Sequence, residues 1–294
     1  MKTQPTGPVV VGGVGGSGTR VVAEMLMIFG FYLGNDLNRA HDNLLYTLLF
    51  KRPRWFYENH ENRQEMATGI RLFRKLMLGQ GGLSFAEWGF LLEALYSMAR
   101  FGHTPRGAGK GAWPLERMQR VLFAKERLSA AHAGWGWKEP NAYLLVENLA
   151  EQLDGFRYIH TMRHGLDMAF SDNQQQLYNW GQYFGVPWPD SPRNEPRASL
   201  QYWVKANEYA LETGGKLGSD RFLLIDFDQL CLTPEAELKK LLAFLAIDVD
   251  DRAYRAALAL PKKPRSMGRY RQHDLNQFDP SHLAALAGLG FSLD

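Results

Sequence analysis

Residues 9–20 read VVVGGVGGSGTR, and this stretch decides the fold. Its three valines predict a short buried strand, and the five glycines that follow predict a loop. Apolar residues then recur at helical spacing from Val21 to Phe29. A strand, a glycine loop and a helix start in this order favour an anionic phosphate. The glycines allow close approach, and the first amides of the helix point at the negative charge. The stretch therefore predicts a nucleotide site in an α/β fold.

The loop by itself allows several interpretations. Gly13 to Gly18 satisfies G-x-G-x-x-G, with Asp36 where a ribose-binding acid falls, which favours an NAD(P)-binding oxidoreductase. The same residues have the spacing of a P-loop, but Thr19 stands where ATPases and kinases carry lysine. A loop for the 5′-phosphosulfate of a sulfonate donor is the third interpretation, and it needs no magnesium. A glycine turn without a ligand is the structural alternative.

A second motif follows another predicted strand, residues 157–162. Arg163 comes directly after this strand, and Ser171 comes eight residues later on the next predicted helix. Arginine provides a charged two-pronged donor and serine provides a hydroxyl, so the two can close on one phosphate group. The motif therefore predicts a second phosphate site.

With both motifs, the chain resembles sulfotransferases that use 3′-phosphoadenosine-5′-phosphosulfate (PAPS). In that family the first loop usually reads P-[RK]-S-G-T-[TS] and binds the 5′-phosphosulfate, and an R-x7-S motif binds the 3′-phosphate. Residues 17–19 (SGT) carry the first motif here, and Arg163 with Ser171 carries the second. Residues 135–140 (WGWKEP) resemble the family's W-x-x-K-[DT]-P segment, and residues 222–245 resemble its strand, proline turn and helix.

The resemblance implies a donor site without a metal. Its expected donor-binding residues are Gly15, Gly16, Ser17, Gly18, Thr19, Arg20, Arg163, Ser171, Arg269 and Arg271. The last two lie on a basic loop, residues 262–271, which holds five lysines and arginines. The basic residue that the family carries in the first loop is absent, because Gly16 occupies its position. We therefore expect Lys138 and Arg20, with the loop amides, to stabilise the charge on the leaving group. A catalytically idle nucleotide-binding protein is an alternative that Gly16 raises.

The acceptor hydroxyl must lose its proton, which requires a carboxylate or histidine within hydrogen-bond reach. The resemblance implies a base a short distance past the first loop, where Asp36 is nearest and Asp42 is the alternative. Asp36 also has a structural interpretation, because it can cap the following helix. The choice between the two stays open.

Four predicted strands, residues 9–11, 135–138, 157–162 and 222–227, are each followed by a helix. This order predicts an α/β fold with a central, mainly parallel sheet flanked by helices, of the P-loop-like sulfotransferase kind. The donor is expected across the carboxyl ends of the first and third of these strands. Residues 1–294 are expected to form one domain.

Within that domain, residues 40–133 are expected to form a helical insertion on the acceptor side. Trp88, Leu91, Leu92, Leu95 and Met98 form one of its apolar stripes, which predicts core packing. The aromatic segment from Trp180 to Trp188 is interpreted as a loop that faces the acceptor.

Bulk properties indicate an ordinary globular protein, with 45% hydrophobic and 22% charged residues. A net charge of +3 is too small to indicate nucleic acid as a partner. The single cysteine, Cys231, favours a reducing compartment. No run of about 18 apolar residues predicts a membrane span, and residues 1–8 are too short and polar for a signal peptide. We therefore expect a cytoplasmic protein of bacterial origin. Glycan, protein and small-molecule acceptors all stay open, as does the oligomeric state.

Overall fold

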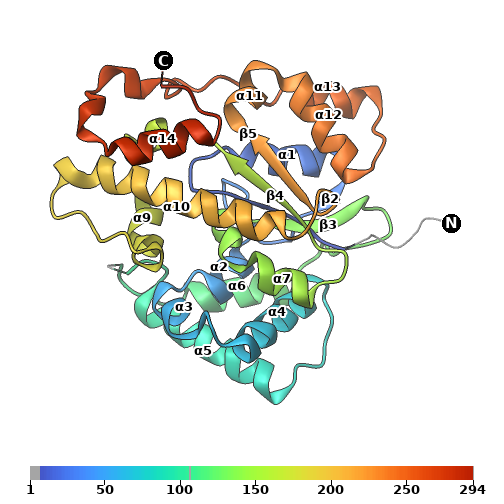
Figure 1. Ribbon diagram of the computed structural model, residues 1–294. Coiled ribbons are helices and arrows are strands. Elements are labelled where there is room, and N and C mark those ends of the chain that lie inside the picture. Colours follow the sequence, from blue (N-terminus) through green and yellow to red (C-terminus); the bar gives the residue numbers. More distant parts are fainter. Residues whose placement is uncertain (1–6, 106, 294) are drawn as a thin grey trace.

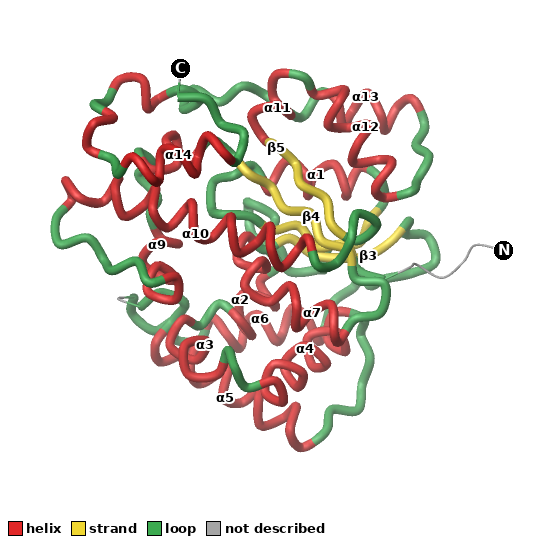
Figure 2. Tube along the Cα trace, viewed as in Figure 1, coloured by secondary structure: helices red, strands yellow, loops and turns green. Residues whose placement is uncertain are grey.

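The computed structural model describes residues 7–105 and 107–293 (Figures 1 and 2). Within these ranges five strands form one parallel sheet, in the order β2-β3-β1-β4-β5. Their bounds are β1 Val9–Gly12, β2 Phe31–Tyr32, β3 Gly134–Lys138, β4 Arg157–Met162 and β5 Phe222–Asp226. The order places β1 in the centre, with β3 and β4 on either side. The predicted parallel α/β fold is confirmed.

The strand predictions differ from the structure at β2 and at Phe227, while β1 extends one residue further, to Gly12, and β3 begins one residue earlier, at Gly134. The sequence analysis missed β2, because two residues are too few to show a period. Phe227 was expected in the last strand but is the first residue of helix α11. The Asp226 side chain accepts hydrogen bonds from the amides of Asp228 and Gln229, which starts the helix one residue earlier than the apolar run suggests.

Helices cover both faces of the sheet, and Figure 1 shows α1, α12 and α13 on one side with α7 and α10 on the other. Val9 and Val11 pack into the core beside α1 and α12, whereas Val10 packs into the core beside α10. All three valines are fully buried, which is why β1 is a continuous apolar run. The helices outside the segment between β2 and β3 are α1 (Thr19–Ile28), α7 (Val146–Gln152), α8 (Gly165–Ala169), α9 (Gln175–Trp180), α10 (Glu195–Gly215), α11 (Phe227–Leu232), α12 (Pro234–Leu245), α13 (Asp251–Leu258) and α14 (Pro280–Gly288).

The segment between β2 and β3 is helical and forms the lower lobe in Figures 1 and 2. Side-chain caps start three of its helices, with Asn43 at α2, Asn62 at α4 and Ser84 at α5. The core expected along α5 is partly wrong: Leu91 and Met98 are buried, but Trp88 and Leu92 are 50% and 60% exposed. Apolar residues occur all round α5, so spacing alone did not identify its buried face. The helices are α2 (Leu44–Phe50), α3 (Pro53–Asn59), α4 (Arg63–Met77), α5 (Phe85–Phe101) and α6 (Trp113–Leu122).

His160 on β4 predicts a pH dependence of stability. Its ring is fully buried, with Nδ1 2.9 Å from the Tyr158 hydroxyl and Nε2 2.9 Å from Asn207 Oδ1. Burial lowers the pKa of His160 to about 4, below the ordinary value of 6.5. The unfolded chain therefore binds this proton first, and the free energy of unfolding should fall as the pH drops from 6.5 towards 4. The expected loss is about 3 kcal/mol.

Urea denaturation at several pH values measures this loss, with His160→Gln as the comparison. The variant should lack the part of the pH slope that His160 contributes. His103, whose pKa burial also lowers to about 4, contributes equally to both proteins and cancels. The same slope in the variant and the natural protein would contradict the prediction.

Candidate active site

The glycine loop is fixed to the strands on both sides of β1. The Gly13 amide donates to the carbonyl of Pro140 at 3.0 Å, just after β3, and the Ser17 hydroxyl lies 3.0 Å from that of Thr161 on β4. Gly16 and Gly18 both have φ +87°, in the left-handed region that favours glycine. A Cβ at Gly18 would also clash with the Phe227 ring. The loop then enters α1 at Thr19.

A cleft of about 450 Å³ opens beside the loop. Residues of the loop form one part of its lining, and residues 173–177 and α10 form another. Among the residues that the structure describes, three cationic side chains line the cleft, those of Arg20, Lys51 and Lys138. Asp42 lines it as well, so the cleft combines helix-start amides, positive charge and one carboxylate.

Lys138 and Asp42 are direct partners in this cleft. The Lys138 ammonium, at the end of β3, donates to the Asp42 carboxylate and, at 3.2 Å, to the carbonyl of Ala40. Only 3% of the Lys138 side chain is exposed, against 16% for Asp42. Asp42 also accepts from Asn38 Nδ2 at 2.8 Å, which fixes the carboxylate beside the lysine.

Arg163 lies at the end of β4 and holds the basic loop that precedes α14. Its Nη2 donates to Ser266 Oγ at 2.9 Å and lies 3.4 Å from Asp167 Oδ2. Its Nε is buried and has no hydrogen-bond partner within residues 7–105 and 107–293. Asp167 also accepts from the Gly268 amide at 2.8 Å. Arg269 Nη1 donates to the carbonyl of Phe170 at 3.0 Å. Arg163 and the basic loop are therefore in contact, as two parts of one phosphate site need to be.

A family model described as the Sulfotransferase family matches residues 8–251. The chain belongs to the sulfotransferase family. Its members are enzymes, and they use a sulfuryl donor and an acceptor. Among curated protein sequences no match was found. The comparisons lend no support to an NAD(P)-binding oxidoreductase, the alternative that the G-x-G-x-x-G match suggests.

Solved sulfotransferase structures are similar to this sulfotransferase along most of its length. STF9 from Mycobacterium avium is 12% identical with a TM-score of 0.50, covering 99% of this chain and 78% of its own. The sulfotransferase domain of the Synechococcus PCC 7002 olefin synthase is 15% identical with a TM-score of 0.48, covering 100% of this chain and 98% of its own. The sulfotransferase domain from the curacin biosynthetic pathway is 16% identical with a TM-score of 0.48, covering 99% and 100%. At such identities the likeness concerns the fold alone.

The sulfotransferase places its two candidate bases in different surroundings. Asp36 is 3% exposed and is not among the residues that line the cleft. Its carboxylate lies 3.2 Å from Arg117 and 3.8 Å from Arg120, and burial raises its pKa while both arginines oppose the rise. Asn43, rather than Asp36, caps the following helix. These contacts favour a structural role for Asp36, which joins α6 to the segment before α2.

Arg20, Ser171 and Arg271 occupy more exposed or more local positions. The Arg20 side chain is 57% exposed, and its Nε lies 3.4 Å from Glu24, which also contacts His41 at 3.1 Å. Ser171 follows α8, and its hydroxyl accepts from the Asn173 amide at 3.3 Å. The Arg271 guanidinium lies 5.0 Å from the ring centroid of Tyr270. Arg20 alone of these three lines the cleft.

Gln176 and Lys51 are among the cleft residues that the sequence analysis did not single out. Gln176 Oε1 accepts from the Gly15 amide at 2.6 Å, and Lys51 lies 3.4 Å from the buried carboxylate of Glu139. Lys51 lies in the helical region that matched no motif, so its only sequence signal was a positive charge after an apolar run. The aromatic interpretation was wrong for Trp180, which is fully buried and donates to Asn141 Oδ1 at 2.7 Å.

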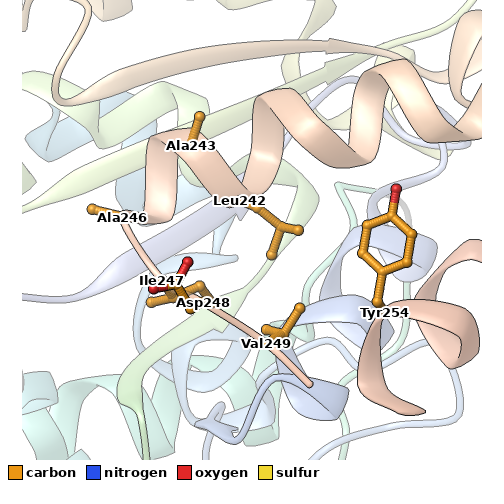
Figure 3. A pocket seen from close by; sticks show the side chains of 7 residues that line it. All are labelled: Leu242, Ala243, Ala246, Ile247, Asp248, Val249 and Tyr254. Carbon is orange, nitrogen blue, oxygen red and sulfur yellow. The ribbon is translucent and has the colours of Figure 1, made fainter. Parts of the chain in front are cut away.

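A second hollow of about 420 Å³ lies at the end of α12 (Figure 3). None of its lining residues is lysine or arginine, so it has no side-chain cation for a phosphate or sulfate group. The lining residues are Leu242, Ala243, Ala246, Ile247, Asp248, Val249 and Tyr254. Within residues 7–105 and 107–293 no helix is both long and apolar enough to span a bilayer.

Proposed function

We propose that this sulfotransferase moves a sulfuryl group from PAPS to a hydroxyl or amine of an acceptor. The acceptor classes considered are a glycan, a protein and a small metabolite. The observation that carries the proposal is the contact between Lys138 and Asp42 in the cleft that the glycine loop lines. A cation for the leaving group and a base for the acceptor are then present at one place.

The residues present fit this donor. The positive φ angles of Gly16 and Gly18 turn the loop so that the first amides of α1 are available to an anion. At the neighbouring strand, the unpartnered Nε of Arg163 and the hydroxyl of Ser266 are donors suited to a second phosphate. Arg163 and Asp167 connect the segment of α8, which Ser171 follows, to the basic loop that carries Arg269. We therefore keep Ser171 and Arg269 in the proposed 3′-phosphate site.

When bound, PAPS supplies an activated sulfuryl group. Lys138 would stabilise the negative charge that develops on the 5′-phosphate side, together with the amides of the glycine loop. Asp42 would take the proton from the acceptor hydroxyl, since its carboxylate lines the cleft and Asn38 holds it in place. Positioning and charge stabilisation carry most of the catalysis in such displacements.

Residues 40–133 are proposed as the helical insertion that covers the acceptor side. Ala40, Asp42 and Lys51 line the cleft together with the glycine loop, so this segment reaches the proposed donor site. Asp42 is the preferred base within it, because Asp36 is buried beneath Arg117 and Arg120.

Nucleotide binding tests the proposal without knowledge of the acceptor. Thermal unfolding and calorimetry should be compared for 3′,5′-diphosphoadenosine (PAP), ADP, NADH and NADPH, without magnesium. We expect PAP to stabilise the native state by about 2.7 kcal/mol at a hundred times its dissociation constant, with ADP much weaker. Stabilisation by NADH or NADPH alone would contradict the proposal. No stabilisation by any of the four would indicate an idle or divergent member of the family.

A further inference from the structure

The backbone of the glycine loop disfavours a side chain at Gly16, the position where the family carries a basic residue. Gly16 has φ +87°, a backbone conformation that residues with a Cβ atom rarely adopt. A Cβ there would lie 3.0 Å from Cε and 3.3 Å from Sδ of Met168. A lysine or arginine there would therefore strain the backbone, and the end of the Met168 side chain would have to shift slightly. The positive charge has to come from another element.

The cationic side chains of Arg20, Lys51 and Lys138 in the cleft differ in their exposure and in their contacts with acceptor groups. Arg20 is more than half exposed and lies beside Glu24, so solvent screens its charge. Lys138 is almost completely buried, and Asp42 and the Ala40 carbonyl already accept from its ammonium. Lys51 is intermediate, with 18% of its side chain exposed. Its charge is shielded from bulk water yet open to the cleft.

The partner of Lys51 leaves most of its ammonium group free for a ligand. Nζ lies 3.4 Å from Glu139 Oε1, a long contact, and an ammonium has three donors. The Glu139 carboxylate is fully buried and already accepts from the amide of Asn141 at 2.7 Å and from its side chain at 2.9 Å. Glu139 therefore holds Lys51 at the cleft, and an anion there could accept from the remaining ammonium hydrogens.

We propose that Lys51 replaces the missing basic residue of the glycine loop and binds the 5′-phosphosulfate end of the donor. This inference rests on the proposed function. In the transfer step Asp42 takes the proton of the acceptor hydroxyl, whose oxygen forms the new bond to sulfur. The bond from sulfur to the 5′-phosphate oxygen breaks, and its electron pair stays on that phosphate. Lys51 and Lys138 together face this new negative charge.

Binding of PAPS and of PAP, measured by calorimetry, tests the role of Lys51 independently of turnover. Lys51→Met should weaken both PAPS and PAP by at least about tenfold, because both carry the 5′-phosphate that Lys51 faces. Release of PAP from PAPS, with water or phenol as probe acceptor, should slow by about 100-fold. Lys51→Arg, which keeps the charge, should retain most of both properties. Lys216→Met is the matched control, since it removes a lysine that is 55% exposed and pairs with Glu147.

The outcomes separate this inference from the proposed function. If the natural protein binds neither PAPS nor PAP, the proposed function fails. If it binds both, and Lys51→Met keeps the natural PAPS affinity and PAP release, only the role of Lys51 is overturned. Thermal unfolding checks that each variant folds. Should Lys51→Met unfold, Lys51→Gln and Lys51→Arg are compared below their melting temperatures, and equal PAPS affinity in these two overturns the inference.

Discussion

Replacing Lys138 with methionine should slow sulfuryl transfer by about 100- to 1,000-fold, the usual effect of removing one donor from a site of developing negative charge. Donor affinity should change far less, because the glycine loop, Lys51 and Arg163 remain. Lys138 is suited to this role because it is 2% exposed at the end of β3, where water screens its charge little. Single-turnover release of PAP measures the rate, and calorimetric binding of PAPS measures the donor affinity, so the two effects are separated.

Asp42 provides the control for this experiment, since Lys138→Met also leaves its carboxylate without an ion-pair partner. Asp42→Asn should reduce the rate while leaving PAP affinity close to that of the natural protein. Asp36→Asn should instead lower the melting temperature through its contacts with Arg117 and Arg120. Equal losses of rate and of donor affinity in Lys138→Met would remove its catalytic assignment.

Replacing Arg163 with methionine should weaken PAP binding by about 10- to 100-fold, as expected when one charged hydrogen-bond donor is lost. ADP binding should not change, because ADP has no 3′-phosphate to lose a partner. Calorimetry with both nucleotides, on both proteins, therefore isolates the contact between Arg163 and the 3′-phosphate.

Arg163 also holds the basic loop through Ser266, and loss of that contact alone could lower affinity. Ser266→Ala removes the contact but keeps the guanidinium, so it should weaken PAP less than Arg163→Met does. If Arg163→Met binds PAP as tightly as the natural protein, the R-x7-S assignment is wrong.

The sequence predicted the sheet because its signals were local. The valines of β1, the glycine loop and the run at residues 157–162 each fall within a few residues of chain. The preference for Asp42 over Asp36 as the proposed base depends on packing between distant segments. Asp36 is neutralised by Arg117, which lies 81 positions away, and Asp42 meets Lys138 across 96 positions. His41, with φ +62°, helps turn the intervening segment in a way that no period indicates.

Lys51 could not be predicted as a site residue from the sequence for a related reason. Its role depends on Glu139, which follows β3, and on the space that Met168 takes from Gly16. Neither contact leaves a pattern in either segment taken alone. The glycine in place of a basic residue was visible in the sequence, but Lys51 could be proposed as the source of the charge only from the placement of the helical region beside the loop.

The strand order also fixes the spacing between the two ends of the proposed donor site. β3 and β4 flank β1, so Lys138 and Arg163 extend from strands two lateral steps apart, or about 10 Å at ordinary strand spacing. Hydrogen bonds along the whole sheet fix that interval, and no loop movement is needed to set it. A nucleotide phosphorylated at only one end can contact either Lys138 or Arg163, whereas a donor that carries both groups can contact both. Selectivity for the donor would then depend on the distance between its two phosphorylated ends, which the strand order matches.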